Sequence, residues 1–411
     1  MKILIVTQYF WPENFRINDL AVGLKDRGHD VEVLTGMPNY PGGQLFPGYG
    51  GFLPATQSFQ GIPVNRVPLV PRGARRNWRL AANYASFALS ASVIGPLRCR
   101  GKIDAIFVYE PSPVTVAIPG IVLRTLKSAP MLFWVQDLWP ESLSATGAIH
   151  SPWTLRLVQR LVNFIYRRCD LVLVSSKGFK NHVLSSGISE DCIAYLPNWA
   201  EELYRPLAET PASVQAEMPG GFKVMFGGNI GSAQSFETII GAAERLRQHP
   251  DIQWVVLGDG NMRPWVADRI RALGLERQFH LLGQRPMDVM PAYFSAADAL
   301  LVTLRADPVF TLTVPSKIQS YLACGKPIIA AINGEGADIV IESGAGIGCP
   351  AENPDKLAQA VLSLYRKPEH ERHAMGRRGR AFFETNFERE MLLSQLERWI
   401  VDLSGKEPCV S

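Results

Sequence analysis

Short runs of apolar residues alternate with helix-periodic stretches along the first half of the chain. Near-continuous apolar runs, of the kind buried on both faces of a sheet, span 2–6, 31–35, 104–109, 131–136 and 171–175. Between the first two, Ile17, Leu20, Ala21 and Leu24 recur at the spacing of one helix face. Repeated strand–helix units of this kind predict a parallel, doubly wound sheet.

The same alternation begins again at Phe222. Strands are predicted at 222–228, 252–260, 279–283, 298–303 and 326–331, and a helix at 235–249 with apolar residues on one face. Residues 205–221 are rich in proline and glycine and poor in large apolar side chains, which predicts a linker. The chain is therefore predicted to be α/β, with two doubly wound Rossmann-like domains and ligands bound beyond the carboxyl ends of the strands.

Length and composition agree with two globular domains. The chain has 411 residues, 47% of them apolar and 19% charged. Its net charge of +4 is too small to indicate a nucleic-acid partner. The six cysteines form no CxxC or Cys/His ligand pattern, which favours a reducing compartment and disfavours structural zinc. The opening MKILIVTQYF is read as a first strand and not as a signal peptide.

The stretch FTLTVPSKIQSYLACGKPIIAA, residues 310–331, predicts a loop, a helix and a buried strand. Pro315 suits the first turn of a helix, with Thr313 or Val314 at the cap. The backbone N–H groups at such a terminus favour an anion, and Lys317 would add a full positive charge. The stretch is also compatible with an ordinary capped helix and a solvated lysine.

Glycine-rich turns follow successive predicted strands of the second half, at 226–237, 257–263 and 282–286. One such turn is weak support, because strand–helix connections often carry glycine for geometry alone. Their repetition, with Arg263, Arg285 and Lys317 nearby, indicates a nucleotide diphosphate lying across the second domain.

The loops of the first half are polar and lack GxGxxG, which disfavours a bound dinucleotide. They follow the predicted strands at 8–19, 37–52, 109–113 and 136–148. Glu110, Asp137 and Glu141 are the carboxylates best placed at strand ends. Each of them could equally be a helix cap or a salt-bridge partner.

Several motifs together resemble one known family. They are QYFWPENFRINDLA, RGHDVEVLTGMPNYP, VQDLWPESLSATGAI, GNIGSAQSFETI, LGDGNMR, VPSKIQSYLACGKPIIAA and EGADIV. From Met1 to about Leu396 the chain is similar to the family-4 glycosyltransferases of GT-B fold. Within that family it most resembles bacterial surface-polysaccharide (O-antigen and capsule) enzymes of the N-acetyl-L-fucosamine transferase type.

The resemblance implies two domains that face each other across a cleft. Residues 1–200 would bind the acceptor and 201–387 the nucleotide sugar, with a helix at about 388–411 packing back onto the first domain. It also implies retaining transfer from a UDP-sugar to a saccharide linked to a lipid diphosphate, with no metal and no other cofactor. Helix termini and basic side chains would neutralise the leaving diphosphate.

The sequence departs from the usual family signature at several positions. The two signature glutamates correspond to Leu312 and Ser320, so Ser320 or Gln319 would take over the contact with the ribose. The usual Arg and Lys correspond to Asn229 and Gln234, which leaves Lys317 as the replacement cation. The family's histidine corresponds to Gln136, which can donate a hydrogen bond but cannot act as a base.

The predicted site falls into three groups of residues. The catalytic candidates are Asp137, Glu13, Arg16, Glu141 and Gln136. The nucleotide-sugar candidates are Gly228, Asn229, Gln234, Gly258, Arg263, Gln284, Arg285, Leu312, Thr313, Val314, Lys317, Gln319 and Ser320. The acceptor candidates are Asn14, Asn18, Asn39, Tyr40, Glu110 and Trp139.

Residues 72–102 predict contact with a membrane surface. Leu80–Leu97 carries no charge and sits at the lower length limit of a spanning helix, but Asn83, Ser86 and Ser90 form a polar stripe. We therefore expect a surface helix whose basic and aromatic rim (Arg75, Arg76, Trp78 and Arg79) rests on anionic lipid. The enzyme would then be peripheral on the cytoplasmic face of the inner membrane. A helix packed in the core, with a solvated basic end, is the alternative.

Two other classes of function are compatible with parts of the pattern. A GT-B fold UDP-sugar 2-epimerase would need an acid, a base and a histidine concentrated near the donor sugar, and the seven histidines are scattered. A nucleotide-binding scaffold without chemistry is compatible with the missing glutamates.

Overall fold

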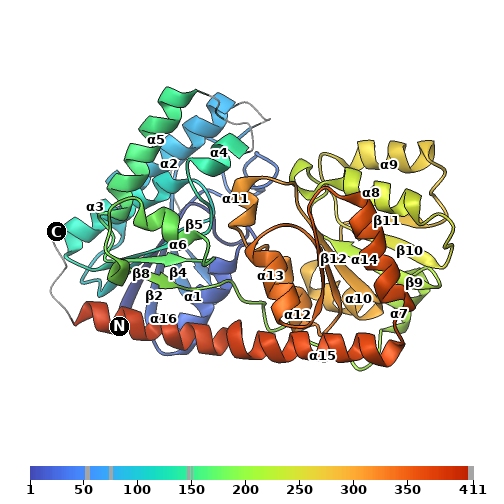
Figure 1. Cartoon of the computed structure of the whole chain (residues 1–411). Coiled ribbons are helices and arrows are strands. Elements are labelled where there is room, and N and C mark those ends of the chain that lie inside the picture. Colours follow the sequence, from blue (N-terminus) through green and yellow to red (C-terminus); the bar gives the residue numbers. More distant parts are fainter. Residues whose placement is uncertain (51–55, 74–76, 146–148, 150, 406–411) are drawn as a thin grey trace. The chain divides into compact units, whose positions relative to one another are not determined.

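The computed structural model describes residues 1–50, 56–73, 77–145, 149 and 151–405. The chain divides into two compact units, which are coloured along the sequence in Figure 1. Unit 1 comprises Met1–Leu196 together with Glu390–Ser411, and unit 2 comprises Pro197–Arg389. Each unit is built around its own sheet, so each is described by itself.

Unit 1 contains an eight-stranded sheet in the order β3-β4-β2-β1-β5-β6-β7-β8. Its strands are β1 (Lys2–Thr7), β2 (Asp30–Gly36), β3 (Thr56–Phe59), β4 (Ile62–Val67), β5 (Ala105–Glu110), β6 (Met131–Val135), β7 (Leu171–Val174) and β8 (Ile193–Tyr195). All neighbouring pairs are parallel except the hairpin of β3 and β4. The predicted doubly wound sheet is confirmed. Strands β3, β4 and β8 were not predicted. The edge strands β3 and β8 are short and only half-buried, and Pro63, Asn65 and Arg66 interrupt the apolar pattern of β4.

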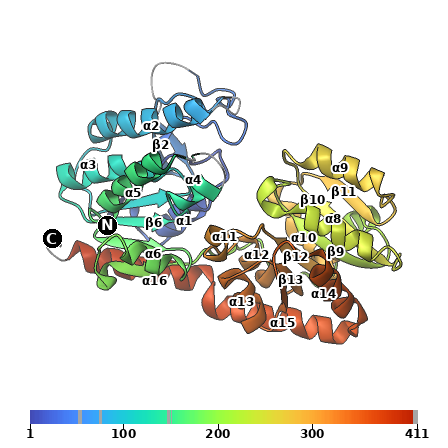
Figure 2. The ribbon, with the colours of Figure 1, turned by 45° about the horizontal axis from the view of Figure 1, so that its top comes forward.

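Helices cover both faces of the unit 1 sheet. They are α1 (Arg16–Asp26), α2 (Asn77–Arg98), α3 (Ala117–Lys127), α4 (Glu141–Ala145), α5 (Pro152–Tyr166), α6 (Phe179–Leu184) and α16 (Arg389–Ser404). Figure 2 shows α2, α3 and α5 in one layer, with α1 and α16 on the opposite side of the sheet.

Helix α2 is a packed part of unit 1. Among the described residues it alone is long and apolar enough to cross a membrane, and 28% of that window is buried. Its polar stripe bonds to neighbouring chain: Asn83 Nδ2 donates to Val70 O at 2.7 Å and Ser90 Oγ to Pro68 O at 2.6 Å. The helix also continues through Pro96 to Arg98. Arg75 and Arg76 lie outside the described residues.

Unit 2 contains a six-stranded parallel sheet in the order β11-β10-β9-β12-β13-β14. Its strands are β9 (Phe222–Gly227), β10 (Ile252–Leu257), β11 (Phe279–Gly283), β12 (Ala299–Thr303), β13 (Ile328–Ala331) and β14 (Gly346–Cys349). The sequence identified the first five. The sixth strand, β14, was not predicted because its sequence GIGC contains two glycines, which are uncommon inside strands.

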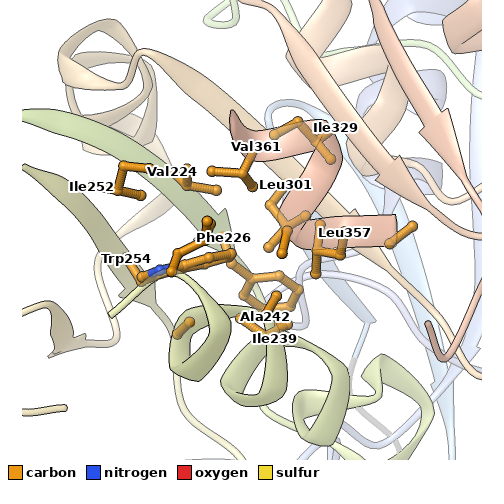
Figure 3. Close-up of a cluster of buried hydrophobic side chains, with 14 of the residues drawn as sticks. Val224, Phe226, Ile239, Ala242, Ile252, Trp254, Leu301, Ile329, Leu357 and Val361 are labelled. Carbon is orange, nitrogen blue, oxygen red and sulfur yellow. The ribbon is translucent and has the colours of Figure 1, made fainter. Parts of the chain in front are cut away.

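The helices of unit 2 pack against this sheet. They are α7 (Ala212–Glu217), α8 (Phe236–Arg245), α9 (Arg263–Ala272), α10 (Met290–Ala296), α11 (Pro308–Thr311), α12 (Lys317–Ala323), α13 (Glu335–Glu342), α14 (Pro354–Arg366) and α15 (Glu369–Asn386). Figure 3 shows side chains from β9, β10, β12 and β13 interleaved with those of α8 and α14. The linker predicted at 205–221 is wrong in part, since residues 212–217 form α7 and Val214 is buried in this unit.

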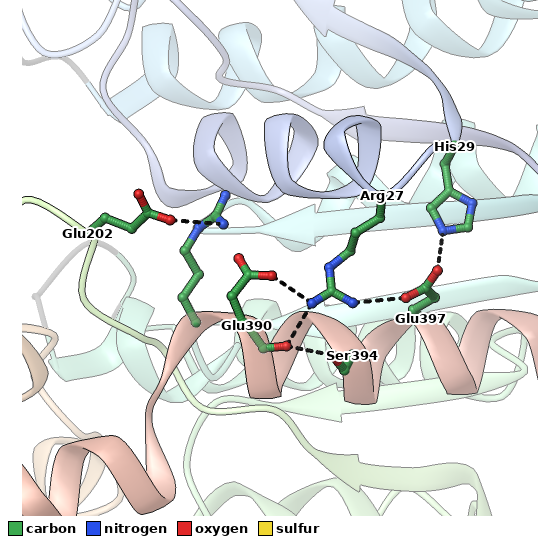
Figure 4. A network of polar contacts seen from close by, with 7 residues as sticks. Arg27, His29, Glu202, Glu390, Ser394 and Glu397 are labelled. Atoms are coloured by element: carbon green, nitrogen blue, oxygen red, sulfur yellow. Dashed lines mark hydrogen bonds and ion pairs between the residues drawn. The ribbon is translucent and has the colours of Figure 1, made fainter.

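The chain returns to unit 1 through α16. Leu392, Leu393, Leu396 and Ile400 are buried, so one side of this helix belongs to the core. Its polar residues bind the end of α1: Arg27 contacts Glu390 at 2.7 Å and Glu397 at 2.9 Å (Figure 4). His29 Nε2 lies 3.0 Å from Glu397, as Figure 4 also shows.

Candidate active site

The glycine loops of unit 2 meet at the carboxyl ends of adjacent strands. The N–H of Gly228, after β9, donates to Leu257 O at 2.8 Å, and the N–H of Gly258, after β10, donates to Gly283 O at 2.9 Å. The N–H of Ile230 donates to Asp259 O at 2.8 Å. Three successive loops are thereby held together at one edge of the sheet, where the sequence placed a nucleotide.

Two of these glycines have no room for a side chain. A Cβ on Gly258 would lie 1.8 Å from Gly228 O, and its φ of +148° is disfavoured for other residues. A Cβ on Gly228 would lie 2.8 Å from Cε of Lys317. The glycines are thus required by the close approach of the two loops and of Lys317.

Lys317 places a cation at this edge without an anionic partner. Its Nζ lies 3.6 Å from the centre of the Phe226 ring, and no ion pair involves it among the described residues. Because the ammonium is desolvated by surrounding protein, its pKa is lowered to about 7. A charge held in this way is a ready partner for a phosphate.

The helix at Lys317 differs in detail from the prediction. It begins at Lys317, with Ser316 as the flanking residue, and not at Pro315. Thr313 Oγ1 donates to Val309 O at 2.9 Å, and Val314 is buried in the core. The segment of Leu312, Thr313 and Val314 connects α11 to α12, and the N–H groups of Leu312 and Thr313 donate to Val309 O at 3.2 Å and Phe310 O at 3.3 Å.

The two candidates for ribose binding are turned toward their own helix. The Gln319 amide lies 3.2 Å from both Ser316 O and Pro315 O. Ser320 Oγ lies 3.4 Å from Ser316 O. Both side chains satisfy the first turn of α12 in this structure, so their assignment to the ribose stays a prediction.

The remaining nucleotide candidates vary in their placement. The Gln234 amide lies 3.3 Å from Asn229 O and Gly231 O, so it braces the loop after β9. Gln284 and Arg263 are exposed, and Arg263 lies 4.0 Å from Asp259. Arg285 instead pairs with Glu217 of α7 at 2.8 Å and with the Tyr293 hydroxyl at 2.8 Å.

Three further residues shape this edge and were not predicted. Thr303, at the end of β12, donates to Gln234 O at 2.6 Å, and the N–H of Arg305 donates to Ala233 O at 2.9 Å. The N–H of Gly227 donates to the Tyr321 hydroxyl at 3.1 Å, which joins α12 to β9. Only the exposed charge of Arg305 could have been noticed in the sequence, because the other roles depend on tertiary packing.

The polar loops of unit 1 also gather at one edge of its sheet. They follow β2, β1, β5 and β6, which are adjacent strands in that order. Parallel strands place their carboxyl ends together, so the candidates near 13, 39, 110 and 137 lie along one edge.

Glu13 organises two of these loops. Its Oε1 accepts the N–H groups of Asn39 at 2.8 Å and Tyr40 at 2.7 Å, and Oε2 accepts the N–H of Phe10 at 3.3 Å. Burial raises its pKa to about 7 although these three bonds lower it. The geometry is that of a carboxylate that positions loops.

The amide candidates near Glu13 also support backbone. Asn18 accepts the N–H of Trp11 at 3.0 Å and donates to Glu13 O at 2.7 Å. Asn39 is fully buried and donates to Met37 O at 2.9 Å. Tyr40 and Asn14 are exposed, so of this group they are the ones available to a ligand.

Glu110 and Asp137 form a pair of carboxyl groups at the ends of β5 and β6. Glu110 is fully buried, and its Oε2 lies 3.4 Å from the N–H of Asp137. Desolvation, followed by the charge of Asp137, raises the pKa of Glu110 well above its usual value. Desolvation also raises the pKa of Asp137 to about 6, against hydrogen bonds from Ser142, Trp139 and Ser112. Both acids therefore titrate closer to neutrality than free carboxyls.

The other catalytic candidates belong to the same unit as Glu110 and Asp137. Glu141 begins α4 and lies 3.3 Å from Nε2 of His182 on α6. Gln136 directly follows β6, and Arg16 is the first residue of α1. Trp139 is buried, and its indole N–H donates to Ser112 Oγ at 3.1 Å.

Two residues of this corner were missed by sequence reasoning. Ser112 bonds to Trp139 and Asp137, and Tyr84 of α2 bonds to Ser112. Desolvation raises the pKa of the Tyr84 phenol. Tyr84 could not be found at the strand ends, because it comes from a helix read as a surface helix.

No cluster of three or more His, Cys, Asp or Glu side chains is placed to hold a metal ion within the described part of the chain. His182 pairs with Glu141 in unit 1, while His29 pairs with Glu397 and His280 with Gln253. No set of acid, base and histidine surrounds Lys317 among the described residues, so the epimerase reading is not favoured.

Two family models together match most of the chain. The model of the glycosyl transferase 4-like domain matches residues 14–199, and that of the glycosyl transferases group 1 matches residues 213–382. Each model matches one of the two units, and the chain is a glycosyltransferase of GT-B fold.

Relatives of similar length have been described in bacteria. The chain is 26% identical to the putative colanic acid biosynthesis glycosyl transferase WcaI of Escherichia coli, over 98% of this chain and 100% of that protein. It is 27% identical to the probable glycosyltransferase WbjE of Pseudomonas aeruginosa, over 72% of each chain.

Solved structures share the fold. HepE of Anabaena in complex with UDP aligns over 98% of this chain and 100% of that chain, with a TM-score of 0.71 at 17% identity. Sucrose-phosphate synthase of Thermosynechococcus elongatus aligns over 98% and 99%, with a TM-score of 0.72 at 17% identity. At these identities the likeness establishes the GT-B fold.

Proposed function

We propose that this enzyme transfers a sugar, with retention of anomeric configuration, from a UDP-sugar to a lipid-linked saccharide during synthesis of a bacterial surface polysaccharide. The observation that carries the proposal is the cation site of unit 2. Lys317 lies beside Gly228, where three glycine loops meet at the strand ends, and no ion pair involves it in the part of the chain that the structure describes. Of the fold neighbours, HepE was solved with UDP, which supports the same ligand here.

The diphosphate would be neutralised by protein groups. Lys317, which lies against Gly228, would supply a full positive charge to the diphosphate. The proposal includes no metal and no other cofactor. Positive charge that faces the departing phosphate stabilises the transition state more than the ground state, because the negative charge on that oxygen grows as the bond to the sugar breaks.

The acceptor would be bound by unit 1. Asp137 and Glu110 are the acidic groups at the strand ends, with Trp139 and Ser112 holding Asp137 in place. We assign to Asp137 the contact with the acceptor hydroxyl or with the positive charge that develops on the sugar. Glu13, Asn18 and Asn39 hold the loops, and Tyr40 offers an exposed aromatic face.

For the donor sugar we propose N-acetyl-L-fucosamine or a related deoxy amino sugar. Leu312 occupies a position where the family usually has a glutamate. An apolar side chain there would suit the methyl group of a 6-deoxy sugar. A glutamate at the same position would find no sugar hydroxyl to bind. The similarity to WcaI, a putative colanic acid enzyme, supports a role in surface polysaccharide synthesis such as that of O-antigen or capsule.

A lipid-linked acceptor places the enzyme at the cytoplasmic face of the inner membrane. We propose that α2 and the residues before it contact anionic lipid there. Arg79 and Trp78 are exposed at the start of the helix, consistent with a basic and aromatic rim.

Incubation with a panel of UDP-sugars, with and without a lipid-diphosphate-linked saccharide, tests this function. UDP release that depends on the acceptor is expected, together with a glycosylated lipid of unchanged anomeric configuration. Isomerised UDP-sugar without acceptor would identify an epimerase, and UDP binding without any product would identify a scaffold.

A further inference from the structure

Helices α2, α3 and α5 form a surface layer that contains no acidic residue. Figure 2 shows the three helices side by side on one face of the unit 1 sheet, and α3 contacts both of its neighbours. None of the three contains Asp or Glu, while each contains two Arg or Lys residues. We call this layer the acid-free face. Acids and bases nearly balance in the whole chain, with 38 against 42, so the segregation is specific to this face.

Apolar side chains line the outside of α2. Trp78, Leu89, Val93 and Leu97 follow each other at helical spacing, and Leu89 remains 69% and Leu97 67% exposed. Because their neighbours Phe87 and Ala91 are fully buried, the helix has an inner face fixed by the core and an outer face open to solvent.

Helix α5 repeats this arrangement with more charge. Trp153, Leu157 and Phe164 are exposed by 67%, 51% and 46%. The exposed residues Arg156 and Arg160 lie on this helix, and the exposed Arg167 and Arg168 directly follow its last residue; we call these four the arginines of α5. A hollow of about 420 Å³ opens here, lined by Arg160, Asn163, Phe164, Arg167 and Arg168. It offers three guanidinium groups next to an aromatic ring.

The opposite side of unit 1 carries both signs of charge. Besides Asp19 and Asp26, α1 carries Arg16 and Lys25, and α16 carries Glu390, Glu397 and Asp402 beside Arg389 and Arg398. A bilayer with anionic headgroups would therefore attract the acid-free face more strongly than the opposite one, which would orient this unit.

We propose that the acid-free face, including α3 and α5 in addition to α2, is the membrane-docking surface of unit 1. Trp153, Leu157, Phe164 and the outer residues of α2 enter the headgroup region, while the arginines of α5 bind lipid phosphates. The inference rests on the proposed function, since it brings the acceptor-binding unit to the bilayer that holds a lipid-linked acceptor. Its test does not depend on catalysis.

A lipid surface fits this face better than a protein partner does. Helices that lie in a bilayer interface typically expose Trp, Leu and Phe together with Arg, as this face does. The apolar side chains are spread over three parallel helices, which suits a flat partner. A second copy of this chain would bring a second set of cations against the first, without acids to pair with them.

Vesicle sedimentation of the full chain tests the role of α5. The triple variant Arg156→Ser, Arg160→Ser, Arg168→Ser is compared with Arg269→Ser, Arg271→Ser, Arg277→Ser, which removes the same charge from exposed positions of unit 2. Each arginine near an anionic surface contributes about 1 kcal/mol, so the α5 variant should bind vesicles containing phosphatidylglycerol on the order of a hundredfold more weakly. The unit 2 variant should bind as the native chain does. Equal binding by all three proteins would overturn the proposal.

UDP binding by the variants separates loss of docking from loss of folding and from failure of the proposed function. A variant that binds UDP normally but not vesicles supports docking through α5, whether or not a transferase product is found.

A second measurement uses the native chain alone. Hydroxyl-radical footprinting with anionic vesicles should protect Trp78, Trp153 and Phe164, whereas the exposed Trp265 of unit 2 should stay reactive. Absence of protection at Trp153 and Phe164 would contradict the proposal. So would lipid-free dimers in which these residues are protected, because the face would then bind a second copy.

Discussion

Lys317 is a cation whose surroundings disfavour its charge. No carboxylate pairs with it among the described residues, and desolvation lowers its pKa to about 7. In the folded enzyme the side-chain amine of Lys317 is therefore only partly protonated near neutral pH. An arriving diphosphate would restore the full charge.

UDP binding should therefore take up a proton. At pH 8 the free Lys317 is mostly neutral, and contact with a diphosphate raises its pKa, so uptake of nearly one proton is expected. At pH 6 the amine is already protonated and uptake through Lys317 should be small. Titration calorimetry in buffers of different ionisation enthalpy measures this difference. Uptake that does not change between the native enzyme and Lys317→Met would remove Lys317 from the site.

Lys317→Met should also make the folded protein more stable. The folded pKa of Lys317 is lowered from 10.5 to about 7, so its charge disfavours folding fully below pH 7, and this effect fades as the pH rises toward 10.5. After allowance for water near the side chain, Lys317→Met should add about 2 kcal/mol to the free energy of unfolding at pH 6. UDP affinity should fall roughly thirtyfold. Denaturant unfolding at pH 6 and pH 10 checks the stability, and the gain should be smaller at the higher pH.

Asp137→Asn should reduce turnover far more than it reduces UDP affinity. With its pKa raised to about 6, the native Asp137 loses its charge below that pH, so kcat/KM should fall about tenfold per pH unit in the acid range. The variant should have lower activity and lack this limb of the profile. If unfolding free energy and turnover fell in parallel while the acid limb remained, Asp137 would be a structural residue.

The sequence predicted the positions of the carboxylates better than the contacts that they make. Glu110 and Asp137 were identified because they stand at the ends of apolar runs, and Glu13 because it lies in the polar loop 8–19 after the first run; both are local properties of the sequence. Glu13 proved to hold three backbone N–H groups, which no spacing reveals. Tyr84 and Ser112 meet at Asp137 from distant parts of the chain, and only the packing of α2 brings them there.

At the scale of elements, the loops after β9 and β10 lie too close together for a methyl group on Gly258. Gly258→Ala would place a Cβ 1.8 Å from Gly228 O at a φ of +148°, so the two loops must separate. We expect destabilisation of about 3 kcal/mol or more and loss of UDP binding. Thermal unfolding and calorimetry measure both.

Gly274→Ala is the matched control for this variant. Gly274 also has a positive φ, +62°, but nothing lies within 4 Å of its added Cβ. It should lose only about 1 kcal/mol and keep UDP affinity. Equal losses in the two variants would show that backbone conformation, and not contact between the loops, is what matters at Gly258.

The elements themselves were predictable where they are buried on both faces. Most central strands of both sheets are continuous apolar runs, and the sequence located these to within three residues, whereas the inner strand β4 was missed because Pro63, Asn65 and Arg66 interrupt its apolar pattern. Strands β3 and β14 carry polar residues or glycine and could not be distinguished from loops. The start of α12 moved from Pro315 to Lys317 because the preceding residues form a separate turn, with the N–H of Ile318 bonded to Pro315 O at 2.9 Å.

At the scale of the molecule, unit 1 depends on a helix that lies about 190 residues beyond the rest of its chain. Leu396 of α16 is fully buried, so Leu396→Ala should cost about 2–5 kcal/mol. The loss should fall on unit 1 alone. Hydrogen exchange should accelerate in β1, β2 and β5 and stay unchanged in β9 and β10. Val401→Ala, at a position 49% exposed on the same helix, is the control and should have little effect. Equal acceleration in both units would mean that they unfold as one body.

The return of the chain through α16 has a consequence for biosynthesis. A ribosome completes unit 2 before it has made the last helix of unit 1, because residues 197–389 precede Glu390 in the chain. During that interval the core surface meant for Leu392, Leu393 and Leu396 stays uncovered on the nascent chain. A chain cut short near its end would carry a complete unit 2, for which we propose UDP-sugar binding, and an unfinished unit 1. Messenger truncation or proteolytic trimming of these final residues would therefore eliminate glycosyl transfer while leaving UDP capture intact.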